Sequence, residues 1–545
     1  MWKSELSMCQ WWAETSLLYA EQQSEREDER YLHTSSHSRR GGIMGKRASA
    51  HKKDLKRNRR HERTNHPHVC NHKPGRKQKP KESHGPVSHG YFGIIERYFG
   101  RLKYFLKNVA DPRKDWMTTY PPEVLLWQAL FMFQTHIESR RQFERDKATD
   151  AFRANLGIIS GNRLEHIAHI DTVNYFMANL NPEELQKVIR KNIRDLIRSK
   201  VLDDFRFDGN FLVAVDGVCF ATFKHPHCEY CLRRTTDGVT TYFHYALVAM
   251  LVSPTGLVLP IEIEFIENTP DKGKTLSEKD DEFKKQDCEL KAFYRLVGRL
   301  KEKFPRLPVT LLLDGLYANR NVISICDKNN WNYFISLQKD SLPAFQKAVA
   351  SNLKKHQENT WQHRTEDCCR TFRWTTVLHH DFQKDSQKKC SPQPLLMFAI
   401  EETEDFCKTK TKRKFAYITN HRPTRENIME LIHEGARQRW KIENETFNTL
   451  KNHGMELQHS YGNKGYCLQN YFLVRFIALS IEQFLTFSNG MIKILSPNTI
   501  LPSREKGISL FGSLKQMAKR LLESLRNDII EIIDLSNVRF SIFSG

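Results

Sequence analysis

The chain has 545 residues, and because single domains usually span roughly 100–200 residues, we expect about two to four structural units. Its 85 Lys and Arg residues against 64 Asp and Glu residues give a formal net charge of +21, which predicts a polyanionic partner, nucleic acid above all. Twelve cysteines in a chain of this length do not make a disulfide framework, which excludes a small disulfide-rich fold.

Residues 1–90 form a basic leader that we expect to be disordered. Within it, residues 39–82 hold 16 Lys and Arg against three Asp and Glu, without the apolar periodicity of a helix or strand. Charge blocks of this kind are either nucleic-acid-binding arms or solvated leaders, and Met44 offers an alternative translation start. Both interpretations stay open.

Residues 91–208 show helical periodicity and are predicted to form an all-helical DNA-binding domain. A proline at Pro121 starts one helix, and Asn181 caps another whose first turn holds Glu183 and Glu184. The second helix carries basic candidates for DNA recognition: Lys187, Arg190, Lys191, Arg194, Arg198 and Lys200.

Residues 209–340 change to the period of β-strands and are predicted to form the first part of an α/β core. The expected elements are strands 211–216, 240–253 and 257–266, helix 288–304, strand 309–314, helix 319–328 and strand 331–337. Two hairpin connections followed by α–β crossovers imply a mixed sheet with flanking helices. The order β-β-β-α-β-α-β resembles that of the ribonuclease-H-like fold.

Residues 341–415 alternate apolar and polar side chains and are predicted to form a β-rich insertion, with a lysine-rich break over 408–414. Helical periodicity returns in residues 416–490, which should complete the ribonuclease-H-like core with a helix capped by Thr424. A C-terminal helical tail is expected over residues 491–545.

The two most apolar stretches, residues 245–266 and 471–487, are interrupted by a turn and by charged residues. Neither supplies the roughly 20 apolar residues that a membrane-spanning helix needs. No signal-peptide pattern is present either, so we expect a soluble cytoplasmic protein associated with the nucleoid.

Two aspartates, Asp216 and Asp314, end otherwise apolar strands. Each is followed by glycine, and Asp-Gly pairs are ordinary turn formers, so either aspartate alone is more often a turn residue than a site. An unpaired carboxylate in an apolar setting is costly, so a third acid at the same place would favour a metal site.

Glu443 is the candidate for that third acid. On a regular helix it shares a face with Trp440, Phe447 and Leu450, so its carboxylate lies within an apolar stripe. An ion pair with Arg439, four residues earlier, is the alternative explanation.

Together, Asp216, Asp314 and Glu443 would form an oxygen-only site suited to Mg²⁺ or Mn²⁺. Two such ions can activate a water molecule and stabilise the leaving oxygen of a phosphodiester. Glu445 lies on the far side of the same helix and is the weaker candidate for the third ligand.

Three sequence blocks resemble those of an insertion-sequence DDE transposase. They are Ala214-Val-Asp216-Gly217, Leu312-Leu-Asp314-Gly315-Leu-Tyr317-Ala-Asn319 and Arg439-Trp-Lys-Ile-Glu443. The separation of 129 residues between the second Asp and the Glu fits the group with a β-rich insertion there, and the resemblance extends over residues 91–487. It implies a ribonuclease-H-like core, Mg²⁺-dependent hydrolysis at transposon ends and attack of the freed 3′-hydroxyl on target DNA, with or without a hairpin intermediate. It also implies double-stranded DNA as the partner and a homodimer in the DNA complex.

The chain departs from this group's Tyr-x-x-Arg-x-x-x-Glu-(six)-Lys signature at both ends. Ala436 stands at the tyrosine position, and Leu450 stands where the lysine is expected, with Lys451 one place later. We expect Arg439, Trp440 and Lys451 to contact phosphates or the flipped end nucleotide of the DNA.

A second cluster contains the pair Cys228-x-x-Cys231, which is a common half of a zinc site. The missing ligands would come from His227, from His244 on the next strand, or from Cys288. Buried or reduced thiols are the alternative, which the lack of a second pair at fixed spacing favours. No glycine-rich phosphate loop is present, so we expect no nucleotide cofactor.

The expected function is therefore Mg²⁺-dependent DNA cleavage and strand transfer by a two-metal mechanism. Two alternatives remain. One is a catalytically inactive, DNA-binding relic of such an enzyme. The other is a ribonuclease-H-like nuclease that shares the metal site but has no preference for repeated terminal sequences.

Overall fold

The computed structural model describes residues 86–542 except 115, 117, 269–286, 339–341, 379–395, 407–408, 410, 496–506 and 532–540. Most of the basic leader expected over residues 1–90 lies outside this part of the chain. Helix α3 (Val87–Phe99) already begins within the range assigned to the leader. Residues from Ser83 onward form one compact unit, and the following description concerns that unit alone.

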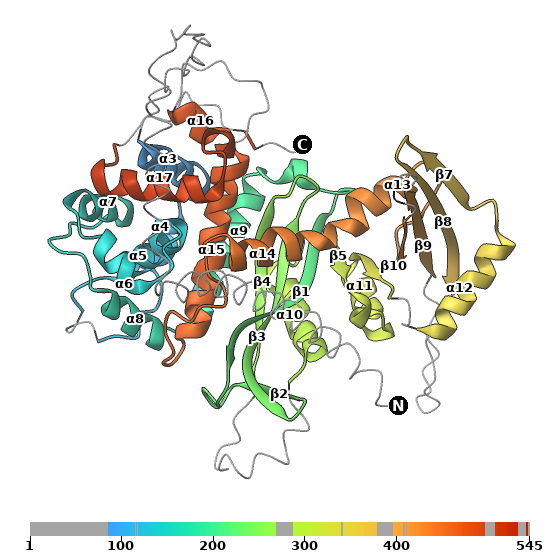
Figure 1. Ribbon diagram of the computed structural model, residues 1–545, viewed down its shortest axis with the longest axis horizontal. Helices are drawn as coiled ribbons and strands as arrows, with labels where there is room; N and C mark the ends of the chain where they lie inside the picture. Colours follow the sequence, from blue (N-terminus) through green and yellow to red (C-terminus); the bar gives the residue numbers. More distant parts are fainter. Residues whose placement is uncertain are drawn as a thin grey trace, which may run out of the picture. The chain divides into compact units, whose positions relative to one another are not determined.

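The leading part of this unit is helical, as expected. Its helices are α3, α4 (Leu102–Lys107), α5 (Pro122–Gln134), α6 (Arg140–Asp146), α7 (Asp150–Ser160), α8 (Ile170–Asn179) and α9 (Pro182–Arg198) (Figure 1). Ser139, Thr149 and Asn181 cap α6, α7 and α9 by accepting a hydrogen bond from a first-turn amide. α5 and α9 both begin with proline. Proline lacks a backbone N–H, but at the first position of a helix an N–H would have no partner within the helix, so no hydrogen bond is lost.

A mixed α/β core follows. Its strands are β1 (Phe211–Phe223), β2 (Leu232–Thr236), β3 (Val239–Val252), β4 (Val258–Ile266), β5 (Val309–Leu313) and β6 (Asn332–Ser336). β1 pairs antiparallel with β3 and parallel with β5, while β6 is parallel to β5. Helices α10 (Glu289–Lys303) and α11 (Arg320–Asn329) form the crossovers. The expected order is confirmed except for β2, whose polar sequence gave no alternation of apolar and polar residues. The expected end of the first strand at Asp216 is wrong, because β1 continues to Phe223 by pairing with β3.

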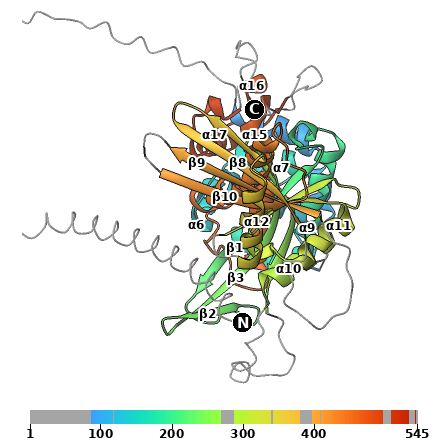
Figure 2. The ribbon, with the colours of Figure 1, turned by 90° about the vertical axis from the view of Figure 1, so that its right-hand side faces the viewer.

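The predicted insertion continues this same sheet. It contains helix α12 (Pro343–Lys355) and the strands β7 (Thr360–Arg364), β8 (Cys368–Leu378), β9 (Leu396–Phe406) and β10 (Thr411–Thr419). β10 pairs antiparallel with β6, so the sheet runs β6-β10-β9-β8-β7, and α12 lies against β8 (Figures 1 and 2). The lysine-rich interruption of the strands that we expected over residues 408–414 is wrong from Thr411 onward, where strand β10 begins. There Lys412 and Lys414 pair with Asp405 and Glu401 of β9 and are held on the strand.

The helical stretch after β10 is irregular. It passes through α13 (Ile428–Glu430), η6 (Leu431–Gly435), η7 (Ala436–Arg439), η8 (Ile442–Phe447) and α14 (Asn448–Asn452). η6 and η8 have the wide hydrogen-bonding pattern of a π-helix, and η7 has the tight 3-10 pattern. A side chain at Gly435 would collide with the ring of Phe334 on β6, so this glycine lets the helix pass close to the sheet. The Thr424 hydroxyl accepts a bond from the Asn427 amide, but the helix begins later, at Ile428.

Helix α15 (Cys467–Phe487) is buried along almost its whole length and joins the helical part to the sheet. It contacts α3, α5, α8 and α9 on one side and β4 on another. The tail helices α16 (Gly490–Leu495) and α17 (Leu514–Asn527) pack back onto α3 (Figure 1). Within the described residues, no helix combines the length and the apolar character needed to cross a membrane.

Candidate active site

Asp216 and Asp314 lie next to each other on neighbouring parallel strands. β1 and β5 pair in register as far as Ala214 opposite Leu312, and each aspartate follows two residues later. Because side chains alternate between the two faces of a sheet, both carboxylates lie on the same face as that pair. Adjacent strands are about 4.8 Å apart, which makes the two aspartates direct neighbours.

Each aspartate also forms a local hydrogen bond through its Oδ1 atom. The amide of Leu316 donates to Asp314 over 2.8 Å, where the 3-10 turn η4 (Gly315–Tyr317) begins. The amide of Gly217 donates to Asp216 over 2.8 Å. The turn interpretation is therefore correct for Asp314 and wrong for Asp216, which lies inside β1. These bonds use one oxygen of each carboxylate, so they are compatible with a metal-binding role.

Arg439 connects Glu443 to this pair. Its guanidinium lies 2.9 Å from Glu443 Oε1 and 3.5 Å from Asp216 Oδ2, and the arginine is only 8% exposed. Glu445 pairs instead with Lys441, at 3.7 Å. The structure thus places the three predicted acids around Arg439, and it also contains the Arg439–Glu443 ion pair that was the alternative explanation for the third acid. Among the described residues, their oxygens are not grouped as closely as the ligand atoms of the His/Cys cluster described below.

The charged forms of these carboxylates are costly where they lie. Burial is the largest cause of a raised pKa at both Asp216 and Asp314. Negative charges on Glu443 and Glu289 raise the pKa of Asp216 further, while Arg439 lowers it. Asp216, Asp314 and Glu443 therefore share the positive charge of Arg439, and Glu289 adds negative charge beside them. Their donor atoms are all oxygens, which fits Mg²⁺ or Mn²⁺ and does not fit a soft metal.

Glu289 is an acid that sequence reasoning missed. It is the first residue of α10, and its carboxylate accepts hydrogen bonds from the hydroxyls of Tyr317 (2.7 Å) and Tyr245 (3.3 Å). Burial raises its pKa to about 7, and the charge of Asp314 adds to that shift. A side chain at Gly217 would collide with Tyr245, so this glycine leaves room for the ring. An acid in the first turn of a helix is ordinary, so the sequence contained no signal for this residue.

Lys451 lies within electrostatic reach of the acids. Burial lowers its pKa, and the charges of Asp216 and Glu443 oppose that lowering. The lysine follows Glu443 by eight residues, one more than the transposase signature allows. The π-helical η8 explains the difference, because a π turn holds one residue more than an α turn and so returns the lysine to the face of the acid.

One part of the facial argument for Glu443 is wrong. Trp440, expected in the same apolar stripe, is 47% exposed, whereas Phe447 and Leu450 are buried. The reason is that 100° per residue holds only for a regular α-helix, and this stretch changes from a 3-10 turn to a π turn. The Arg439 guanidinium lies over the exposed indole, 5.0 Å from the ring centroid.

The second predicted cluster also comes together. His227, Cys228, Cys231 and His244 offer ligand atoms that all lie within 4.8 Å of one another. Cys288 is exposed at the start of α10 and does not belong to this group. The partners of the Cys-x-x-Cys pair are therefore the two histidines.

The basic face predicted on α9 is only partly available to DNA. Arg190 is buried and donates hydrogen bonds of 2.7 and 2.6 Å to Glu262 of β4, so its assignment as a DNA contact is wrong. Lys187 is paired with Glu184. Arg198 and Lys200, at the end of the helix, remain exposed.

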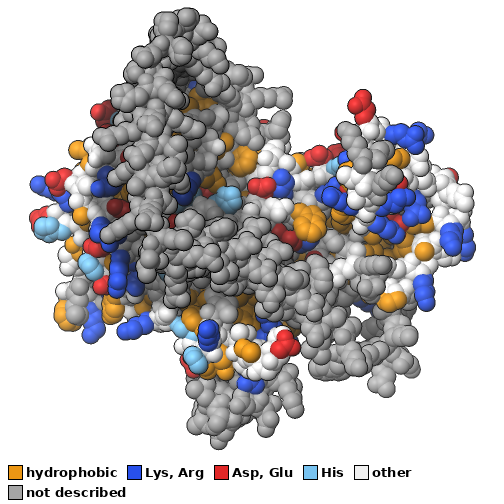
Figure 3. All heavy atoms as spheres, viewed as in Figure 1, with side chains coloured by type: hydrophobic (Ala, Val, Ile, Leu, Met, Phe, Trp, Pro, Cys, Tyr) orange, Lys and Arg blue, Asp and Glu red, His pale blue; other side chains and the backbone are white. Residues whose placement is uncertain are grey.

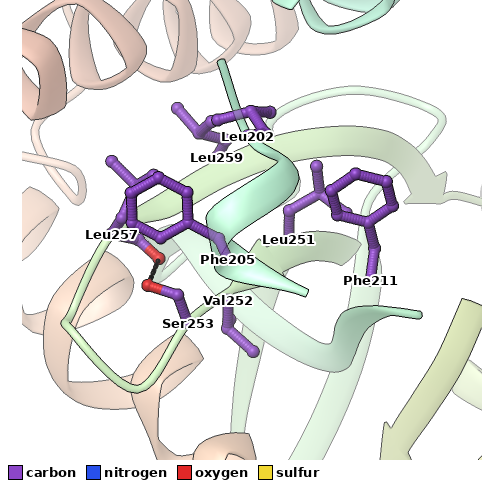
Figure 4. A pocket seen from close by; sticks show the side chains of 8 residues that line it. All are labelled: Leu202, Phe205, Phe211, Leu251, Val252, Ser253, Leu257 and Leu259. Carbon is purple, nitrogen blue, oxygen red and sulfur yellow. Dashed lines mark hydrogen bonds between the residues drawn. The ribbon is translucent and has the colours of Figure 1, made fainter. Parts of the chain in front are cut away.

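A small pocket at the start of β1 contains none of these acids. Its eight lining residues are Leu202, Phe205, Phe211, Leu251, Val252, Ser253, Leu257 and Leu259 (Figure 4). The hydroxyl of Ser253 donates to the Leu257 carbonyl over 3.2 Å. None of the eight side chains titrates, so we assign this pocket no chemical role.

No protein-family model matches this chain, and a comparison with curated proteins also finds no match. The functional argument therefore depends on the fold and on the geometry of the site.

Proposed function

We propose that the protein is a DDE-type DNA transposase that cleaves DNA at the ends of an insertion sequence and transfers the cut strand to a target. The observation that carries the proposal is the convergence of three acids from separate elements. Asp216 comes from β1, Asp314 from the end of β5 and Glu443 from the π-helical η8. Carboxylates are expensive to bury together, so a fold that assembles them here has a use for a cation.

The strand order supports a ribonuclease-H-like core. The sequence β4-β3-β1-β5-β6 across the sheet places three antiparallel strands first and two parallel strands after them. The two aspartates lie on the central strand and on the parallel strand beside it. In open α/β sheets, ligands bind outside the carboxyl ends of the strands, near the point where the strand order reverses, and Asp314 occupies such a position.

Each side chain has a distinct part in the proposed reaction. Asp216, Asp314 and Glu443 would hold two divalent ions, which when bound activate a water and stabilise the leaving 3′-oxygen of the scissile phosphodiester. Arg439 was expected to contact DNA, but it is buried and its guanidinium holds the oxygens of the first and third acids, so we assign it a positioning role instead. Lys451, partly buried beside the acids, would neutralise a DNA phosphate.

Charge outside the site supports a DNA substrate. Lys and Arg side chains gather over the part of the molecule that β7–β10 form (Figure 3). On β10, the side chains of Lys412 and Lys414 are 72% and 57% exposed, and Arg413 is exposed between them. Lys412 and Lys414 share one face of the strand, where they also pair with Asp405 and Glu401 of β9, and Arg413 lies on the opposite face. The two lysines would therefore contact DNA phosphates in competition with these ion pairs.

The proposal is tested by Mg²⁺-dependent cleavage of DNA that carries the sequences flanking the coding region, with Glu443→Gln compared with Glu445→Gln. We expect Glu443→Gln to reduce the cleavage rate by about 1000-fold or more, since losing about 4 kcal/mol of transition-state stabilisation costs three powers of ten. Glu445→Gln removes a carboxylate from the same helix but from outside the acid group. It should leave the rate within about tenfold of wild type.

Other outcomes point elsewhere. Loss of cleavage only in Glu445→Gln would move the third ligand and contradict the assignment of Glu443. A wild-type protein that binds the flanking sequences but never cuts them would be an inactive relic. Cleavage without preference for those sequences would indicate a nuclease of the same fold.

A further inference from the structure

The His/Cys cluster lies where the antiparallel pair of β1 and β3 extends beyond the acids. His227, Cys228 and Cys231 belong to the loop between β1 and β2, and His244 lies on β3 opposite Ala221. The segment that carries these three loop residues therefore folds back onto the strand that carries the fourth. Nothing in the proposed cleavage reaction uses any of them.

The distances between these side chains match a tetrahedral metal site. The two Sγ atoms of Cys228 and Cys231 are 3.7 Å apart, and His244 Nε2 lies 3.5 and 3.4 Å from them. Zinc bound at about 2.3 Å to sulfur and about 2.05 Å to nitrogen requires roughly 3.8 Å between two sulfurs and roughly 3.6 Å between sulfur and nitrogen. A disulfide would require about 2.05 Å, so the pair is not oxidised.

A second observation also points to a ligand. The Nδ1 atom of His227 is buried and makes no hydrogen bond to any described residue, although buried polar atoms are normally satisfied. The ring itself is fixed, because it stacks on Phe223 with centroids 4.3 Å apart and planes 14° apart. An imidazole held rigidly with an unsatisfied nitrogen is suited to bind a metal.

The surroundings hold the loop in the shape that ligation needs. The side-chain amide of Asn268 donates to the Cys231 carbonyl over 2.8 Å, and the Cys228 amide donates to the Cys231 sulfur over 3.4 Å. The second bond brings an N–H dipole to a sulfur that would carry negative charge as a thiolate. Both bonds stabilise a zinc-bound geometry of the Cys-x-x-Cys turn.

We propose that His227, Cys228, Cys231 and His244 bind one structural Zn²⁺ ion. Two thiolates and two imidazoles complete a tetrahedral zinc shell, so no position stays open for substrate or water. The ion would fix the β1–β2 loop to β3 and so hold the base of the β2–β3 hairpin. This site, with soft sulfur ligands, would select zinc, while the oxygen-only acid group selects Mg²⁺ or Mn²⁺.

The test measures the metal content of the purified full-length protein by mass spectrometry after reconstitution with zinc. We expect one zinc per chain in wild type, none in Cys231→Ser, and one in Cys288→Ser, which removes an exposed cysteine outside the cluster. Equal zinc in wild type and Cys231→Ser, or no zinc in wild type, would overturn the proposal.

Two measurements on wild type keep the test independent of how well the variants fold. Replacement of zinc by Co²⁺ should give the visible absorption of tetrahedral cobalt with thiolate ligands, and octahedral cobalt spectra would contradict the site. Chelation should increase amide hydrogen exchange in residues 224–236 while leaving α5 unchanged. Unchanged exchange in that segment would show that no metal holds the loop.

Discussion

Asp314→Asn is expected to abolish DNA cleavage and, in the absence of divalent ions, to make the protein more stable than wild type. The loss of cleavage should be about 1000-fold or more, because the amide is a poor ligand for Mg²⁺. The gain in stability has a separate cause. Burial raises the pKa of Asp314, so the folded protein binds this proton more tightly than the unfolded chain does.

The sign of that effect follows from linkage. A carboxyl whose folded pKa is raised costs folding free energy once the pH exceeds its unfolded value of about 4, and it costs the full amount above its folded pKa. Asparagine carries no charge at any pH and can still accept the bond from the Leu316 amide. The denaturation midpoint in chelator at neutral pH should therefore be higher for Asp314→Asn than for wild type.

In the presence of divalent ions, wild type should instead be more stable than Asp314→Asn. Under the proposed function, Mg²⁺ or Mn²⁺ would bind the folded wild type only, and at about 100 times the dissociation constant this linkage would add about 2.7 kcal/mol. Asp314→Asn should gain much less. Retained binding to the flanking DNA would show that the variant is folded. If Asp314→Asn were less stable than wild type in chelator, the charged Asp314 carboxylate would not destabilise the metal-free fold, and this explanation would be contradicted.

Arg475→Met is expected to lower the free energy of unfolding by about 2–4 kcal/mol, since a carbonyl left without its donor in the interior costs about 1–3 kcal/mol. Arg475 is buried in the middle of α15 and donates to the carbonyls of Met455, Glu456 and His459 at 2.8 to 3.0 Å. Burial lowers its pKa to about 10, so it stays charged at neutral pH. Methionine fills much of the volume but donates to none of these groups.

A matched control is Arg101→Met. Arg101 is also an arginine that forms an ion pair, with Asp195 at 3.0 Å, but its side chain is 62% exposed. Exposed pairs contribute about 0–1 kcal/mol, so this variant should remain close to wild type in chemical denaturation. If both variants lost the same stability, the carbonyl contacts of Arg475 would not explain the effect.

Most of the core strands and the capped helices could be predicted because their signals are local. An apolar run that ends in Asp-Gly marks β5 and the first half of β1, and Asn181 followed by Pro182 marks the start of α9. What the sequence did not reveal depends on pairing between distant segments. β10 joins the sheet by pairing with β6, and no local pattern in either strand specifies that partner.

In the site, too, features with a local sequence signal could be predicted, and features that depend on tertiary packing could not. The three acids were recognisable from their spacing and from their expected elements, and the two histidines of the Cys-x-x-Cys cluster were among the candidates. Glu289 was not, because its position near Asp314 depends on where α10 packs. The shift of Lys451 by one residue was visible, but its cause, the wide turn at η8, is a matter of backbone geometry.

The continuity of the sheet across β6 and β10 limits how the chain can be shortened. A recombinant fragment from which residues 341–419 were removed would leave β6 as an open edge strand, with its central residues buried and apolar on both faces. Open apolar edges recruit strands from other chains, so such a fragment should aggregate rather than yield a minimal nuclease. The strands that look like an accessory insertion therefore complete the sheet and cover the edge of β6.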